Sequence, residues 1–180
     1  MQRLTRAAGQ ALDLARDEAR RLRHKKVRTE HLLLGVLRCE KGLGGEVLRA
    51  RGVSLEEARA AVERLGSHGD EELWAALIPF SARSRRALER AADEAGSLAD
   101  NRVGTEHIVL SLLRDEDGGG AQVLSAFGLD YERARDAVVA ARVSPRRRPN
   151  GWHRPRDVQL ALGVVAVFAA GVLVGRLLRV

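Results

Sequence analysis

Aromatic residues, prolines and cysteines are scarce in this sequence of 180 residues. Aromatic side chains make up 3% of it, proline occurs four times, and Cys39 is the only cysteine. A single cysteine excludes an intrachain disulfide and a cysteine-rich zinc site. The prolines fall outside the stretches with helical periodicity, whereas alanine, leucine and arginine, which favour helices, are abundant. The composition therefore predicts an all-α protein.

Two functional signatures are also missing. No GxxxxGK[ST] pattern occurs, so these residues contain no phosphate-binding loop of the kind that ATPases use. The amino-terminal segment carries a charge every few residues and has no apolar run, so we do not expect a secretory signal there. The sequence therefore predicts neither an ATP-driven enzyme nor a secreted protein.

Positive charge is concentrated in one part of the chain. The net charge is +7, and residues 143–180 hold seven arginines against one acidic residue, Asp157. Residues 1–142 hold 24 basic and 23 acidic residues, so this part is close to neutral. A nucleic-acid-binding domain needs its basic residues on the folded surface that tracks the phosphates. We therefore expect no nucleic-acid partner.

The sequence contains an internal duplication. "VRTEHLLLGVLR" covers residues 27–38, and "VGTEHIVLSLLR" covers residues 103–114. At this constant offset of 76, 19 of the 36 residues from 27 to 62 are identical to those from 103 to 138. This similarity predicts two tandem repeats in a domain over residues 1–142, the first at about 3–66 and the second at about 79–142.

Each repeat reads as four helices. Thr5 and Ser81 are suited to cap the first helix, whose apolar residues recur at intervals of three and four. The second helix opens at the "TEH" phrase, the third ends at Gly52 or Gly128, and the fourth follows. The predicted fold is thus all-α, with eight helices in two four-helix repeats.

The residues after 142 have a different character. Residues 143–157 are basic and rich in proline, which predicts an extended tether. Residues 158–175 contain one polar side chain, Gln159, and two arginines follow; at 1.5 Å per residue, residues 158–180 span about 34 Å, which predicts a single transmembrane helix. The arginines before the span predict that the domain lies in the cytoplasm. Gly171 and Gly175 form a GxxxG motif that can pair helices into a homo-oligomer.

The duplicated phrases resemble the Clp N-terminal domain, the doubled four-helix module at the front of the ClpA- and ClpC-type Hsp100 unfoldases. The resemblance covers about residues 3–142 and includes both "TEH" phrases. It implies a non-catalytic module that binds adaptors and substrates and needs no cofactor. No ATPase motif follows the module here, and a predicted membrane anchor takes its place.

Two interpretations of the "TEH" phrases remain open. In the architectural one, Thr29 and Thr105 cap their helices, Glu30 and Glu106 complement the helix dipoles, and the histidine that follows supports the turn. In the other, each phrase forms a pocket in which the helix start attracts a phosphate and the glutamate pairs with a guanidinium. The resemblance to ClpC-type proteins associates this glutamate with phosphoarginine.

The two predicted pockets differ at one position. Arg28 stands where the second repeat has Gly104, and it can fill the first pocket or pair with Glu30, so we expect the second pocket to be more intact. We expect no metal, since neither repeat has an HExxH pair or a second ligand close in sequence to its histidine. No nucleophile accompanies the histidines either, which argues against a hydrolase.

We therefore expect a membrane-tethered module that binds proteins of the Clp system, namely adaptors, substrates, or an ATPase or protease subunit. The alternative is a structural protein that oligomerises in the membrane and whose domain only packs against other copies. Recovery of Clp adaptors or substrates with the domain would distinguish the first function from the second.

Overall fold

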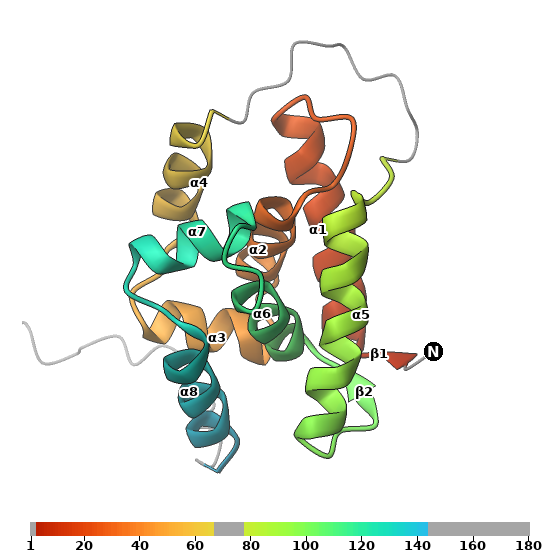
Figure 1. Ribbon diagram of the computed structural model, residues 1–180, viewed down its shortest axis with the longest axis vertical. Helices are drawn as coiled ribbons and strands as arrows, with labels where there is room; N and C mark the ends of the chain where they lie inside the picture. Colours follow the sequence, from red (N-terminus) through yellow and green to blue (C-terminus); the bar gives the residue numbers. More distant parts are fainter. Residues whose placement is uncertain (1–2, 67–77, 144–180) are drawn as a thin grey trace, which may run out of the picture. The chain divides into compact units, whose positions relative to one another are not determined.

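The computed structural model describes residues 3–66 and 78–143, which belong to one compact unit, Met1–Pro145. These residues form eight helices and two very short strands (Figure 1). In chain order the elements are β1 (Arg3–Leu4), α1 (Arg6–Arg21), α2 (Thr29–Arg38), α3 (Leu43–Ala50), α4 (Leu55–Arg64), α5 (Ala82–Ser97), β2 (Arg102–Val103), α6 (Thr105–Leu113), α7 (Gly119–Ala126) and α8 (Tyr131–Val143). The predicted all-α fold of two four-helix repeats is confirmed.

Local sequence signals set most of the helix ends. The hydroxyl groups of Thr5 and Ser81 accept hydrogen bonds from backbone amides of the first turns of α1 and α5, at 3.1 Å in both helices. After α3 and α7 the chain turns at Gly52 and Gly128, whose φ angles are +82° and +71°. Glycine adopts these angles without the strain that a side chain would bring.

Helices α2 and α6, which begin with the "TEH" phrases, form the centre of the domain (Figure 1). Every residue of α2 from Thr29 to Leu37 is buried, and in α6 every residue except Glu106 is buried. A helix that is covered on all sides needs neighbours from several directions. The other repeat supplies part of this cover, because α2 packs against α7 and α6 packs against α3.

The two repeats interlock through reciprocal backbone contacts. Strand β1 of the first repeat pairs in parallel with β2 of the second, and Val27 forms the corresponding bridge with Phe80. The amide of Thr5 donates to the Val103 carbonyl and the amide of Ser81 donates to the Val27 carbonyl, both at 2.9 Å. Each repeat therefore completes the backbone hydrogen bonding of the other.

The predicted tether and transmembrane helix lie outside the described residues. Among residues 3–66 and 78–143, no helix has the length and apolar character needed to cross a membrane. The membrane anchor and the cytoplasmic location of the domain therefore remain predictions from the sequence.

Candidate functional site

The threonines of the two "TEH" phrases serve the opposite repeat. The Thr105 hydroxyl accepts a hydrogen bond from the Gly44 amide in α3 at 3.0 Å, and the Thr29 hydroxyl accepts one from the Gly120 amide in α7 at 3.3 Å. Each threonine thus satisfies a free amide at the start of a helix in the other repeat. The predicted role of each hydroxyl as the cap of its own helix is therefore wrong. The reciprocal packing of α2 on α7 and α6 on α3 explains the difference.

The histidines support the starts of α2 and α6, as the architectural interpretation predicted. Nδ1 of His31 accepts the Arg28 amide at 2.9 Å, and Nδ1 of His107 accepts the Gly104 amide at 2.8 Å. Burial, together with smaller contributions from the nearby His24 and Arg28, lowers the pKa of His31 to about 3. Burial also lowers the pKa of His107, although Glu106 and Asp100 act in the opposite direction. Both rings are therefore neutral at physiological pH.

Potential second metal ligands lie close to both histidines in space, although neither repeat has an HExxH pair. His24 lies with Glu30 and His31 in a buried cluster whose ligand atoms are within 4.8 Å of one another, and Asp100 forms the equivalent cluster in the second repeat. Because Nδ1 of His31 accepts a backbone amide, its proton is on Nε2, which lies 2.8 Å from Nδ1 of His24. The ring nitrogens of His31 are thus used in hydrogen bonds and offer no lone pair to a metal.

A pocket of about 340 Å³ opens at the start of α2, and we call it the first pocket. The residues that line it include Arg28, Thr29, Glu30, Leu65, Arg83 and Gly119. Glu30 is 5% exposed, and its carboxylate has two long contacts, one with the Thr29 hydroxyl at 3.4 Å and one with the Arg28 guanidinium at 3.8 Å. Buried carboxylates normally have close charged or hydrogen-bonding partners. The first pocket therefore contains a buried anion whose bonding capacity is largely unused.

Two guanidinium groups line the first pocket along with Glu30. Arg28 and Arg83 have side chains that are 52% and 43% exposed, Arg83 also pairs with Asp115 at 3.2 Å, and α7 begins beside the pocket at Gly119. A methyl group on Gly119 would lie 2.6 Å from a carboxylate oxygen of Glu30, so the glycine leaves room for the carboxylate in this position. A helix start and two guanidinium groups attract an anion, and the carboxylate attracts a cation.

The corresponding place in the second repeat is filled by Arg142 of α8. Its guanidinium binds the Asp100 carboxylate, lies 3.0 Å from Nε2 of His107, and lies 3.5 Å from the Glu106 carboxylate. The Arg142 side chain is 26% exposed. Both glutamates therefore have a guanidinium nearby, but the partner of Glu106 is largely buried, whereas Arg28 beside Glu30 is half exposed.

Arg28 pairs with Glu30 at 3.8 Å, one of the two arrangements predicted for it, but its side chain is half exposed and the first pocket stays open. In the second repeat Arg142, which the sequence did not point to, lies beside Glu106, so we infer that the first pocket is the more accessible one. At the offset of 76, Gly66 corresponds to Arg142 and His24 corresponds to Asp100. This difference between the repeats is visible in the sequence. Only the fold places the end of α8 beside Asp100.

Comparisons with known proteins agree with this fold. The ClpA homolog of Guillardia theta, an ATP-binding subunit of the ATP-dependent Clp protease, is 40% identical over 138 residues, which are 77% of this chain and 17% of that protein. This chain therefore spans a small part of that relative. The crystal structure of the ClpD N-terminal domain from Arabidopsis thaliana is 27% identical with a TM-score of 0.61, and the match covers 77% of this chain and 93% of that one.

A ClpV N-domain solved in complex with a VipB peptide also has this fold, with a TM-score of 0.61 and 19% identity over 77% of this chain and 88% of that one. Residues 3–127 and 79–172 match the family of the Clp repeat (R) N-terminal domain. These matches extend over both repeats and include both "TEH" phrases. The chain therefore belongs to the Clp repeat (R) N-terminal domain family.

Proposed function

We propose that this chain binds protein partners of the Clp system and that the first pocket recognises a phosphorylated arginine on them. The Clp N-terminal domain is a non-catalytic protein-interaction domain, and Clp N-terminal domains bind partner peptides, as the ClpV complex with a VipB peptide illustrates. The observation that carries the proposal is the buried Glu30 carboxylate, which has only long contacts at the base of an open pocket.

The chemistry of the first pocket fits a ligand with both charges. The guanidinium of a phosphoarginine would pair with Glu30 as Arg142 pairs with Glu106 in the second repeat. Its phosphoryl group would lie toward Arg28, Arg83 and the start of α7, where the positive charge is found. An unmodified arginine would use only the carboxylate, and a phosphoserine would use only the positive groups. Phosphoarginine therefore makes the fullest use of the pocket.

Matched peptides test this assignment. We expect the full-length chain to bind a peptide with one phosphoarginine at least about tenfold more tightly than the same peptide with arginine or phosphoserine, because each control loses a charge-assisted contact. Glu30→Gln keeps the shape of the side chain and removes its charge, and it should weaken phosphoarginine binding by a similar factor. Fluorescence anisotropy measures all of these affinities.

Glu106→Gln is the matched control, since Arg142 already occupies that carboxylate. It should leave phosphopeptide binding unchanged, and both variants should keep the melting temperature of the parent within a few degrees. Equal binding of the three peptides, or a Glu30→Gln variant that binds as tightly as the parent, would show that the first pocket does not recognise phosphoarginine.

We also propose that residues 158–180 tether this domain to the cytoplasmic face of a membrane, so that partners are bound there. The support is the length and apolar character of the segment and the arginines that precede it. The full-length chain should stay in the membrane pellet after an alkaline carbonate wash, and deletion of residues 158–180 should release it. Extraction of the full-length chain by carbonate would contradict the tether.

A further inference from the structure

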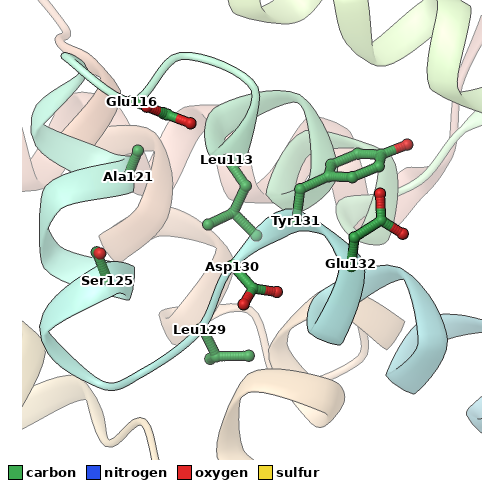
Figure 2. A pocket seen from close by; sticks show the side chains of 8 residues that line it. All are labelled: Leu113, Glu116, Ala121, Ser125, Leu129, Asp130, Tyr131 and Glu132. Atoms are coloured by element: carbon green, nitrogen blue, oxygen red, sulfur yellow. The ribbon is translucent and has the colours of Figure 1, made fainter.

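A second cavity, of about 300 Å³, lies in the second repeat between the end of α6, helix α7 and the start of α8. Apolar side chains and three carboxylates line it, and these residues are Leu113, Ala121, Leu129, Glu116, Asp130 and Glu132. Figure 2 shows Leu113 and Asp130 near its middle, with Ser125 of α7 on one side and Glu132 of α8 on the other. This cavity shares none of its residues with the first pocket.

The internal duplication shows what occupies the equivalent place in the first repeat. Ser125 corresponds to Arg49, whose guanidinium donates a hydrogen bond to the Leu37 carbonyl at 3.1 Å, at the end of α2. The same Arg49 nitrogen lies against Gly45, where an added methyl group would be 3.0 Å away. Since Leu37 and Gly45 correspond to Leu113 and Ala121 of the cavity, the first repeat places a guanidinium where the second has an opening.

The cavity has the chemistry of a guanidinium site. Leu113 is the last residue of α6, so the negative end of that helix dipole faces a group bound there. Glu116 and Glu132 add two carboxylates that the first repeat also has, as Glu40 and Glu56. Asp130 adds a third where the first repeat has Ser54.

The neighbours of Asp130 leave the cavity acidic. One Asp130 oxygen accepts the Arg133 amide at 2.8 Å, and the Arg133 guanidinium lies 3.5 Å from the other oxygen. This ion pair is exposed, so solvent weakens it. The net negative charge and the apolar walls suit a side chain with an apolar stem and a planar cationic end.

We propose that this cavity binds an arginine side chain of a protein partner, in the position that Arg49 takes in the first repeat. The partner supplies in trans the guanidinium that Ser125 cannot supply in cis. Arginine fits better than lysine because the guanidinium donates to several acceptors in one plane, here the end of α6 and the carboxylates around it. The proposal is independent of phosphoarginine binding in the first pocket.

The test is a titration of the full-length, ¹⁵N-labelled chain with N-acetylargininamide, and with N-acetyllysinamide as the matched probe. We expect saturable shifts of the Leu113, Ser125 and Leu129 amide signals in NMR spectra, with an apparent Kd at least about threefold lower for the arginine probe. Glu30→Gln should leave these shifts unchanged, so failure of this proposal and failure of the first pocket are distinguished.

Two substitutions identify the cavity as the binding place. Ser125→Arg copies the first repeat and should abolish the saturable shifts, whereas Ser125→Ala should keep them. Asp130→Asn with Glu132→Gln should weaken binding by about tenfold, and it spares the fold because asparagine also caps a helix. Equal affinity for the two probes, or unchanged binding in the Ser125→Arg and the double variant, would overturn the proposal.

Discussion

Replacing Gly35 by alanine is expected to lower the free energy of unfolding by about 3 kcal/mol or more. Gly35 lies in α2 where this helix crosses α1, and an added methyl group would overlap the Ala11 carbonyl oxygen and lie 2.8 Å from the Ala15 amide nitrogen. These atoms are backbone atoms of α1, so no flexible side chain can move aside. The helices must separate, which opens the packing around the buried α2.

The second repeat provides the control for this substitution. Ser111 occupies the equivalent position in α6, is buried, and donates a hydrogen bond to the Ile108 carbonyl at 2.8 Å. Ser111→Ala should therefore cost only about 1 kcal/mol, through the loss of this hydrogen bond. Urea unfolding followed by circular dichroism measures both variants. Equal stability of Gly35→Ala and Ser111→Ala would show that α1 and α2 do not approach as closely as described.

Separating the repeats after Gly66 is expected to abolish cooperative folding of the first half. Without the second repeat, the Thr5 amide loses the Val103 carbonyl, the Gly44 amide loses the Thr105 hydroxyl, and α2 loses α7. Each uncovered polar group and apolar surface costs free energy, and the stability of a domain of this size is only about 5–15 kcal/mol. Residues 1–66 alone should therefore show weak helicity and a broad thermal transition.

Mixing the halves tests whether the interlock is responsible. Residues 1–66 combined with residues 67–180 should regain helicity and a single sharp unfolding transition, because the reciprocal contacts need no covalent link between the repeats. Circular dichroism at equal concentrations of the two fragments gives the comparison. A sharp, reversible transition of residues 1–66 alone would mean that each repeat is stable by itself.

The features that the sequence predicted are those determined by nearby residues. Thr5 and Ser81 cap the helices that follow them, and Gly52 and Gly128 end the turns after α3 and α7, because such signals act within a few residues. The duplication also predicted eight helices. The two-residue strands were not predicted, since Arg3–Leu4 pairs with Arg102–Val103, a partner from the other repeat that is far away in the sequence.

At the candidate site too, the sequence predicted what nearby residues determine and missed what residues from other helices determine. The sequence predicted the role of the histidines, which depends on one helix turn, and Glu30 and Glu106 remain predicted pocket residues. It did not predict the surroundings of the two glutamates, because these include residues from other helices, namely Gly119 at Glu30 and Arg142 at Glu106. A residue-by-residue comparison of the repeats does reveal one difference between the two sites, because the first repeat has Gly66 where the second has Arg142.

The first pocket is proposed as a site for phosphoarginine, with Arg142 occupying the same place in the second repeat. Calorimetric titration of free phosphoarginine into the full-length chain, Glu30→Gln and Arg142→Ala distinguishes the two repeats. We expect one binding site per chain in the parent, binding at least about tenfold weaker in Glu30→Gln, and a second, weaker site in Arg142→Ala. No heat from the parent at millimolar ligand, or undiminished binding in Glu30→Gln, would contradict the proposal.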